Sequence, residues 1–195
     1  MASRREILQV GAAMALPFSA PAEWATGVDA TIGIRLDTVV YDSRYGVARR
    51  FGAESRLLGH RTREFNGDMT SVWYDDLYYR WRRAPAAIAG MTTAGALFCF
   101  EQLALDQRMR ILFRAEHRAV GNGGFAHRMI GPEPVLSLAV NRVPAEADLG
   151  RSMAALVTRV PLGTPVANAE FHSASSDIAG EFALYSWVIA PSVRT

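Results

Sequence analysis

Along the first half of the chain, the spacing of apolar residues alternates between the pattern of a strand and the pattern of a helix. Short runs rich in β-branched and aromatic residues predict strands, and they alternate with longer segments whose apolar side chains recur at helical spacing. The predicted strands are residues 38–41, 61–65, 86–89 and 110–113. The predicted helices are residues 45–59, 69–83 and 92–107. Alternation at this spacing is typical of a parallel sheet with right-handed crossovers.

The second half departs from this alternation. The glycine-rich residues 121–124 predict the tip of a hairpin within residues 121–131, and residues 134–140 predict a fifth strand. An amphipathic helix is expected to begin at Pro144 and run to Val160, and the apolar residues 182–190 predict a last strand. We therefore expect one α/β domain over residues 37–195, three layers deep. Its sheet is expected to be mixed but mostly parallel, with a Rossmann-like first half.

Two of the predicted helices carry further expectations. In residues 69–83, Trp73, Leu77 and Trp81 form an apolar stripe, while Asp76 and Arg80 are spaced to pair on the polar side. The helix of residues 92–107 is apolar almost all round, which predicts that it is deeply packed and that Cys99 is an inert buried thiol.

The N-terminus has the features of an export signal. Ser3, Arg4 and Arg5 precede a short, weakly apolar segment, and small residues follow at positions 20–22. This arrangement resembles a bacterial twin-arginine (Tat) signal peptide over residues 1–22, followed by a linker over residues 23–36. An ordinary N-terminal helix is the alternative. The resemblance implies a periplasmic protein that crosses the membrane already folded, carrying a cofactor or travelling with a protein partner.

Composition narrows the classes of function. The chain has 195 residues, 50% of them hydrophobic, and a net charge of +2, which suits one globular domain. All 21 basic residues are arginine, so chemistry that needs a lysine is excluded. Neither a dense basic run for nucleic acid nor a second apolar segment of membrane-spanning length occurs in the sequence.

The candidate site lies where the predicted strands end. Because ligands bind outside the carboxyl ends of strands in open α/β sheets, the polar residues after four strands are expected to meet at one edge. We assign Asp68 and His117 as candidate catalytic residues. The candidate ligand-binding residues are Asp42, Ser43, Arg44, Thr92, Thr93 and Glu116. Such an edge, with helix N-termini pointing toward it, would attract a small anionic ligand.

Plainer interpretations stand beside this site. Ser43, Asp68 and Thr92 occupy positions where helix caps belong, and Arg44 could simply pair with a neighbouring aspartate. Metal binding by Glu116 with histidines at 117, 127 and 172 lacks a recognisable spacing, and Glu116 and His117 would point to opposite faces of a strand. No glycine-flanked serine elbow or dinucleotide fingerprint is present, so no metal site is predicted and the cofactor stays unknown.

Two functions follow from these observations. An export signal without a cofactor motif favours a periplasmic accessory subunit or small-ligand-binding protein of a larger assembly, possibly an oxidoreductase complex, co-exported with its protein partner. A free-standing periplasmic enzyme is the alternative, in which arginines hold an anionic substrate and Asp68 or His117 moves a proton. Tyr79, with Arg82 and Arg83, is off the apolar stripe and could mark a surface that faces another protein.

Overall fold

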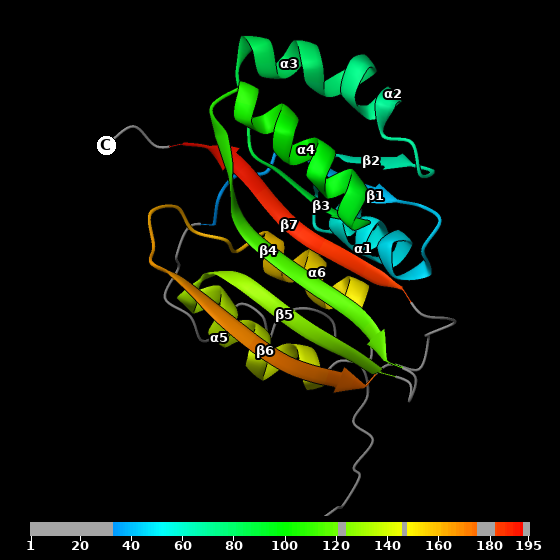
Figure 1. Cartoon of the computed structure of the whole chain (residues 1–195), viewed down its shortest axis with the longest axis vertical. Helices are drawn as coiled ribbons and strands as arrows, with labels where there is room; N and C mark the ends of the chain where they lie inside the picture. Colours follow the sequence, from blue (N-terminus) through cyan, green and yellow to red (C-terminus); the bar gives the residue numbers. More distant parts are fainter. Residues whose placement is uncertain (1–32, 121–123, 146–147, 175–181, 193–195) are drawn as a thin grey trace, which may run out of the picture. The chain divides into compact units, whose positions relative to one another are not determined.

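A computed structural model describes residues 33–120, 124–145, 148–174 and 182–192 (Figure 1). The predicted signal peptide and most of the predicted linker lie outside these residues. The strands are β1 (Thr38–Asp42), β2 (Thr62–Phe65), β3 (Ile88–Thr92), β4 (Met109–Val120), β5 (Gly124–Pro132), β6 (Val166–Ala174) and β7 (Ala183–Pro191). The helices are α1 (Gly46–Leu57), α2 (Thr70–Val72), the π-helical turn η2 (Trp73–Leu77), α3 (Tyr78–Arg83), α4 (Ala94–Asp106), α5 (Glu133–Arg142), the 3-10 turn η3 (Val143–Ala145) and α6 (Leu149–Val157).

The seven strands form one mixed sheet in the order β2-β1-β3-β7-β4-β5-β6. Pairing is parallel only within β2-β1-β3, and the pairs β3-β7, β7-β4, β4-β5 and β5-β6 are antiparallel. The prediction of a mostly parallel sheet is therefore wrong, because the last strand, β7, inserts between β3 and β4. The α/β class is confirmed, whereas the Rossmann-like first half stays a prediction.

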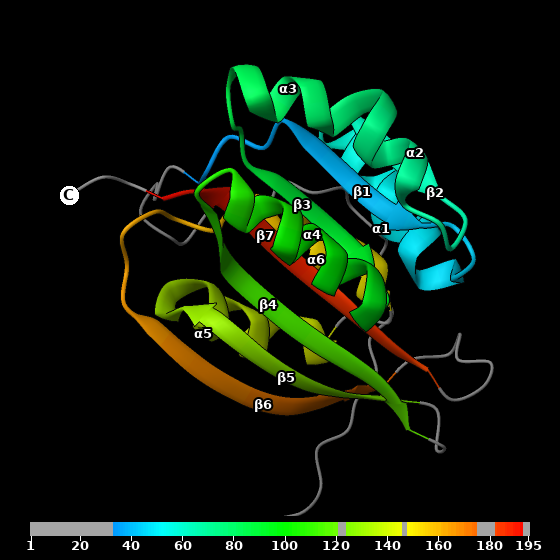
Figure 2. The same cartoon turned by 45° about the horizontal axis from the view of Figure 1, so that its top comes forward.

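Helices cover both faces of the sheet, but not along its whole width. In both views α2, α3 and α4 lie on one face, while α1, α5 and α6 lie on the other (Figures 1 and 2). Alternation along β1 divides the core accordingly: Val39 and Tyr41 join the cluster under α1 and α6, and Val40 joins the cluster under α3 and α4. Over β5 and β6 the face that carries α4 elsewhere is left uncovered (Figure 2).

Helices α1 and α6 approach each other closely, and a glycine makes this possible. A Cβ on Gly150 of α6 would lie 2.4 Å from the carbonyl oxygen of Val47 and 2.8 Å from the amide nitrogen of Phe51, both in α1. Backbone atoms cannot move aside as a flexible side chain can, so only glycine fits there. The contact holds α1, which lies over β1 and β3, beside α6, which lies over β7.

Two predictions for the second half are wrong. Residues 134–140, predicted as a strand, lie in helix α5, because Val135, Leu136 and Ala139 recur at helical spacing behind Pro134 in the first turn. Strand β6 was not predicted at all. Of its inward residues, Ala167, Ala169 and Ser173 are small and only Phe171 is large, so its alternation produces a weak hydrophobic signal.

Helix α4 is only half buried, which corrects the expectation of deep packing. It buries Ala96, Leu97, Phe100 and Ala104 against the sheet. Its other side leaves Phe98 60% and Leu105 61% exposed, and Cys99 is exposed as well, not buried as predicted. Among the described residues, no helix has the length and apolar character needed to cross a membrane.

Candidate functional site

The strand ends named by the sequence share one edge of the sheet. Because β4 is antiparallel to β7 and β7 is antiparallel to β3, β4 runs in the same direction as β1, β2 and β3. All four carboxyl ends therefore lie along the edge where the candidate residues were expected. Within that edge, however, the side chains divide between the two faces of the sheet and most of them bind one another.

Asp42 and Arg44 form the tightest pair at this edge. Asp42 is fully buried and accepts hydrogen bonds from Arg44 Nε at 3.0 Å and Nη2 at 2.6 Å. The Asp42 hydrogen bond raises the pKa of Arg44, which stays charged. Ser43 donates its hydroxyl to the carbonyl of Phe65 at 3.0 Å. The polar groups of all three residues are thus used to close the turn after β1.

Asp68, Thr92 and Thr93 stabilise the starts of helices. Asp68 is exposed and accepts a hydrogen bond from the Thr70 amide at 2.8 Å. Hydrogen bonding to the Thr70 hydroxyl, and then to this amide, lowers the pKa of the Asp68 carboxyl. Thr93, and not Thr92 as expected, caps α4 by accepting from the Ala96 amide at 3.5 Å. Thr92 is buried and accepts a hydrogen bond from Trp187 Nε1 at 3.0 Å.

Glu116 and His117 point to opposite faces of β4, as their adjacency in an extended strand requires. Glu116 lies on the uncovered face and accepts a hydrogen bond from Arg118 at 3.0 Å. His117 is fully buried on the other face, in the core under α5 and α6. The structure therefore does not bring His117 together with Asp42, Asp68 or Thr92 on one surface.

A chain of four polar side chains crosses the buried face of four strands. His117 Nδ1 is 2.8 Å from His127 Nδ1, and their Nε2 atoms are 2.7 Å from the hydroxyls of Ser186 and Ser173 respectively. The four residues come from β4, β5, β7 and β6 and are all buried. Both histidines were considered from the sequence, but the two serines were not. The only sequence signal for the serines is that each lies at an inward-facing position of its strand.

Both histidines are neutral in this chain. Burial lowers the pKa of His117 well below 6.5 and that of His127 to about 4. Each neutral imidazole has one donor and one acceptor nitrogen, so one serine can donate at one end and the other can accept at the opposite end. Every ring nitrogen is then satisfied, and no charged form is needed to hold the four strands together.

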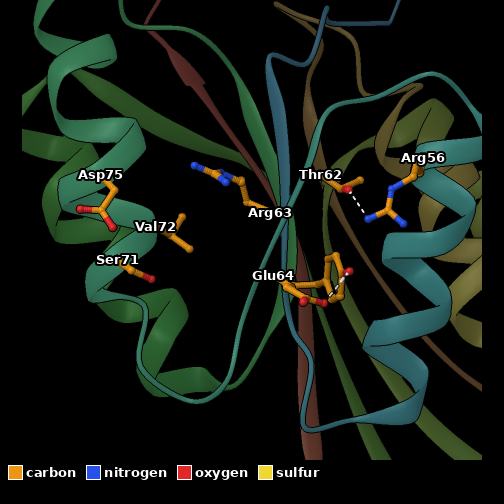
Figure 3. A pocket seen from close by; sticks show the side chains of 8 residues that line it. Arg56, Thr62, Arg63, Glu64, Ser71, Val72 and Asp75 are labelled. Atoms are coloured by element: carbon orange, nitrogen blue, oxygen red, sulfur yellow. Dashed lines mark hydrogen bonds between the residues drawn. The ribbon is translucent and has the colours of Figure 1, made fainter.

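A hollow of about 410 Å³ lies along the outer edge of β2 (Figure 3). Ser71, Val72 and Asp75 of the helical segment border one side, and Arg56 of α1 borders the other. Between them, Arg63 points toward the helical segment, while Thr62 and Glu64 point toward α1. Arg56 donates to the Thr62 hydroxyl at 2.9 Å, and Tyr41 donates its hydroxyl to Glu64 at 3.1 Å. The charges lining the hollow are balanced, so they do not select an anion.

A buried carboxylate lies beside this hollow in the π-helical turn. Asp76 accepts hydrogen bonds from Arg61 at 2.9 Å, Arg63 at 3.0 Å and Arg80 at 2.9 Å. The predicted pair of Asp76 with Arg80 is therefore confirmed. Arg63 of β2 and Arg61, which precedes β2, bind the same carboxylate. Arg80 also pairs with Asp37. A π-helical turn is frequent at functional sites, but here its carboxylate is saturated by structural partners.

The described residues contain no cluster of three or more potential metal-ligating side chains. The predicted site residues thus form local hydrogen-bonded pairs or cap helices. Together they do not line one open pocket at this edge of the sheet. No protein-family model, curated protein or solved structure matches the chain.

Proposed function

We propose that this protein is an exported, periplasmic accessory subunit that binds a second polypeptide through the exposed side of helix α4. The single observation that carries the proposal is the apolar character of that side. Phe98 and Leu105, seven residues apart on one face, are 60% and 61% exposed, and Gln102 lies between them. A helix that is apolar all round is ordinarily buried, so its free side fits a protein surface.

The state of the candidate catalytic residues supports an accessory role over an enzymatic one. Asp68 accepts the Thr70 amide, and His117 is enclosed between Ser186 and His127. A general acid or base must reach the proton that it moves, and His117 has no exposed surface. The N-terminal resemblance to a Tat signal adds a reason for a partner, since cargo without its own cofactor travels with a protein that has one.

The first test is co-purification from the periplasm with a tag at the C-terminus. We expect the wild-type chain to bring a second polypeptide in fixed stoichiometry. The Phe98→Ser/Leu105→Ser variant should weaken this association by at least roughly 100-fold, because each buried large apolar side chain contributes about 1.5–3 kcal/mol. Both side chains are mostly exposed, so thermal unfolding of the variant should stay close to that of the wild type.

The matched control is Leu57→Ser, which removes an apolar side chain that is 81% exposed at the end of α1. This control should retain the partner. A wild-type chain that purifies without a partner, or a partner retained by the α4 variant and lost by the control, would contradict the proposal.

A further inference from the structure

Strand β6 is a long edge of the sheet without a neighbour on its outer side among the described residues. It has nine residues, Val166–Ala174, with no proline or arginine among them. The opposite edge, β2, has four residues and is flanked by arginines and by helices on both sides. Proteins usually protect exposed edges by shortening or charging them. β2 follows that rule and β6 does not.

The hydrogen-bond pattern shows which main-chain groups of β6 face outward. The Glu133 amide donates to the Pro165 carbonyl at 3.4 Å, in line with the β5-β6 register that pairs Pro132 with Val166. Odd-numbered residues of β6 are therefore the ones that bond to β5. Antiparallel strands alternate the direction of their N–H and C=O groups, so the even-numbered residues direct theirs to the open edge. These are Val166, Asn168, Glu170, His172 and Ala174.

The same even-numbered residues carry their side chains on the uncovered face, where charges alternate across the strands. Glu116 of β4 is opposite Arg128 of β5, and Arg128 is opposite Glu170 of β6 at 3.4 Å. This row reads acidic, basic, acidic, and it stops at Glu170, whose side chain is 72% exposed. A basic or hydrogen-bond-donating group in the next strand would continue the alternation.

We propose that β6 pairs antiparallel with β6 of a second copy of this chain, about a twofold axis at Phe171. In this register Glu170 of each copy lies opposite His172 of the other, so a carboxylate meets a hydrogen-bond-donating imidazole twice. The two Phe171 side chains face each other on the helix-covered side. All the new main-chain hydrogen bonds come from the even-numbered residues, whose groups are free to make them.

Neighbouring registers that also use the even-numbered residues are less favourable. An axis at Glu170 places the two Glu170 carboxylates directly opposite each other, and like charges in that position are destabilising. An axis at Ala169 places Glu170 opposite Asn168, whose amide can donate but is always neutral, whereas an imidazole can donate and can also carry a positive charge. The charges on β6 therefore select the axis at Phe171, and they select a second copy because the strand is complementary to itself.

The test is sedimentation equilibrium of the full chain over a concentration series. Wild type is expected to be a dimer. Glu170→His and His172→Glu should each weaken it by about tenfold, since each change removes two pairs related by symmetry. The exchange of both residues, Glu170→His/His172→Glu, rebuilds the same two pairs and should restore most of the dimer. An axis at Glu170 predicts instead that Glu170→His alone strengthens the dimer.

A backbone variant tests the edge itself. Asn168→Pro removes an amide that points outward, so β5-β6 pairing is retained while the dimer should weaken at least about tenfold. The control Arg118→Glu, on the same face but in β4, should leave the dimer unchanged. Circular dichroism checks that each variant is folded. A monomeric wild type, or a dimer that the exchange does not restore, overturns the proposal. Neither result bears on the α4 partner, which co-purification tests separately.

Discussion

His117 and His127 are the residues whose chemistry depends most on their surroundings. They are held between Ser186 and Ser173 by contacts of 2.7–2.8 Å, and burial keeps both rings neutral. Two imidazoles and two hydroxyls thereby take the place of apolar side chains on the buried face of β7, β4, β5 and β6. Buried polar chains of this kind are stable only while every member is paired, so the state of one ring affects the whole group.

This pair makes stability depend on pH. A histidine in the unfolded chain titrates near 6.5, whereas the folded pKa of His127 is about 4 and that of His117 is well below 6.5. Between these values the unfolded chain binds more protons, so the free energy of unfolding falls as pH decreases from about 6.5 to about 4, by roughly 3 kcal/mol from His127. Urea unfolding at neutral pH and at about pH 5 should show about 2 kcal/mol of this loss.

The variant His117→Gln/His127→Gln isolates the histidine contribution. It should be less stable at neutral pH, because the polar chain is broken, but should lose less stability on acidification than the wild type. His172→Gln, at an exposed residue of β6, is the comparison variant; because burial is the larger cause of the low pKa of His127 and His172 the smaller one, it should keep most of the wild-type dependence. Equal acid sensitivity in the double variant and the wild type would show that the buried pair is not responsible.

At the scale of elements, Asp76 connects the helical segment of residues 70–83 to strand β2. Its side chain is only 3% exposed and is bound by Arg61, Arg63 and Arg80. Asp76→Asn should lower the free energy of unfolding by about 1.5–3 kcal/mol, because the hydrogen bonds of three partly exposed arginines would lose their common anion. Urea denaturation measures the change. The neighbouring exposed Asp75→Asn should change it by less than about 0.5 kcal/mol, and similar losses in both variants would contradict this role.

The elements predicted best are those whose signal is local. Strand β1 and helix α1 lie within two residues of their predicted limits, since a β-rich run and an apolar stripe determine them directly. Strand β6 was missed because Phe171 is its only large inward side chain and the alanines and serine beside it bury little surface. Helix α5 was taken for a strand because its apolar residues are close together. The Asp76 cluster was predicted only for Arg80, four residues away, since β2 supplies the other partners through tertiary structure.

The candidate site shows the same limit. The carboxyl ends of β1, β2, β3 and β4 share one edge because these strands run in one direction. Pairing of Arg44 with a neighbouring aspartate was the plain alternative from the sequence, and the structure has it with Asp42. The sequence could not show that His117 and His127 lie between two distant serines. The position of β7, the last strand of the chain, decides that neighbourhood, and no local pattern in residues 183–191 reveals which strands it joins.

At the scale of the whole molecule, the resemblance of residues 1–22 to a Tat signal predicts that the folded chain is exported from the cytoplasm. Arg4→Lys/Arg5→Lys should hold it there if residues 1–22 act as the Tat signal that they resemble, because that route reads the arginine pair. Fractionation of bacteria that express the tagged chain measures the distribution. Arg82→Lys/Arg83→Lys, an adjacent and exposed arginine pair in α3, is the matched control and should not alter it. Unchanged export of the first variant would contradict a Tat signal.

The central place of β7 has a consequence for how the protein is made. β7 bonds to β3 on one side and to β4 on the other, so it joins two groups of strands that otherwise share no ladder. Strand β7 follows β3 and β4 in the sequence, so a ribosome delivers it after them, and until then β3 and β4 each present a bare edge in the middle of the future sheet. The sheet of a nascent chain therefore stays in two parts until β7 has emerged, and unpaired edges of this kind favour association between chains.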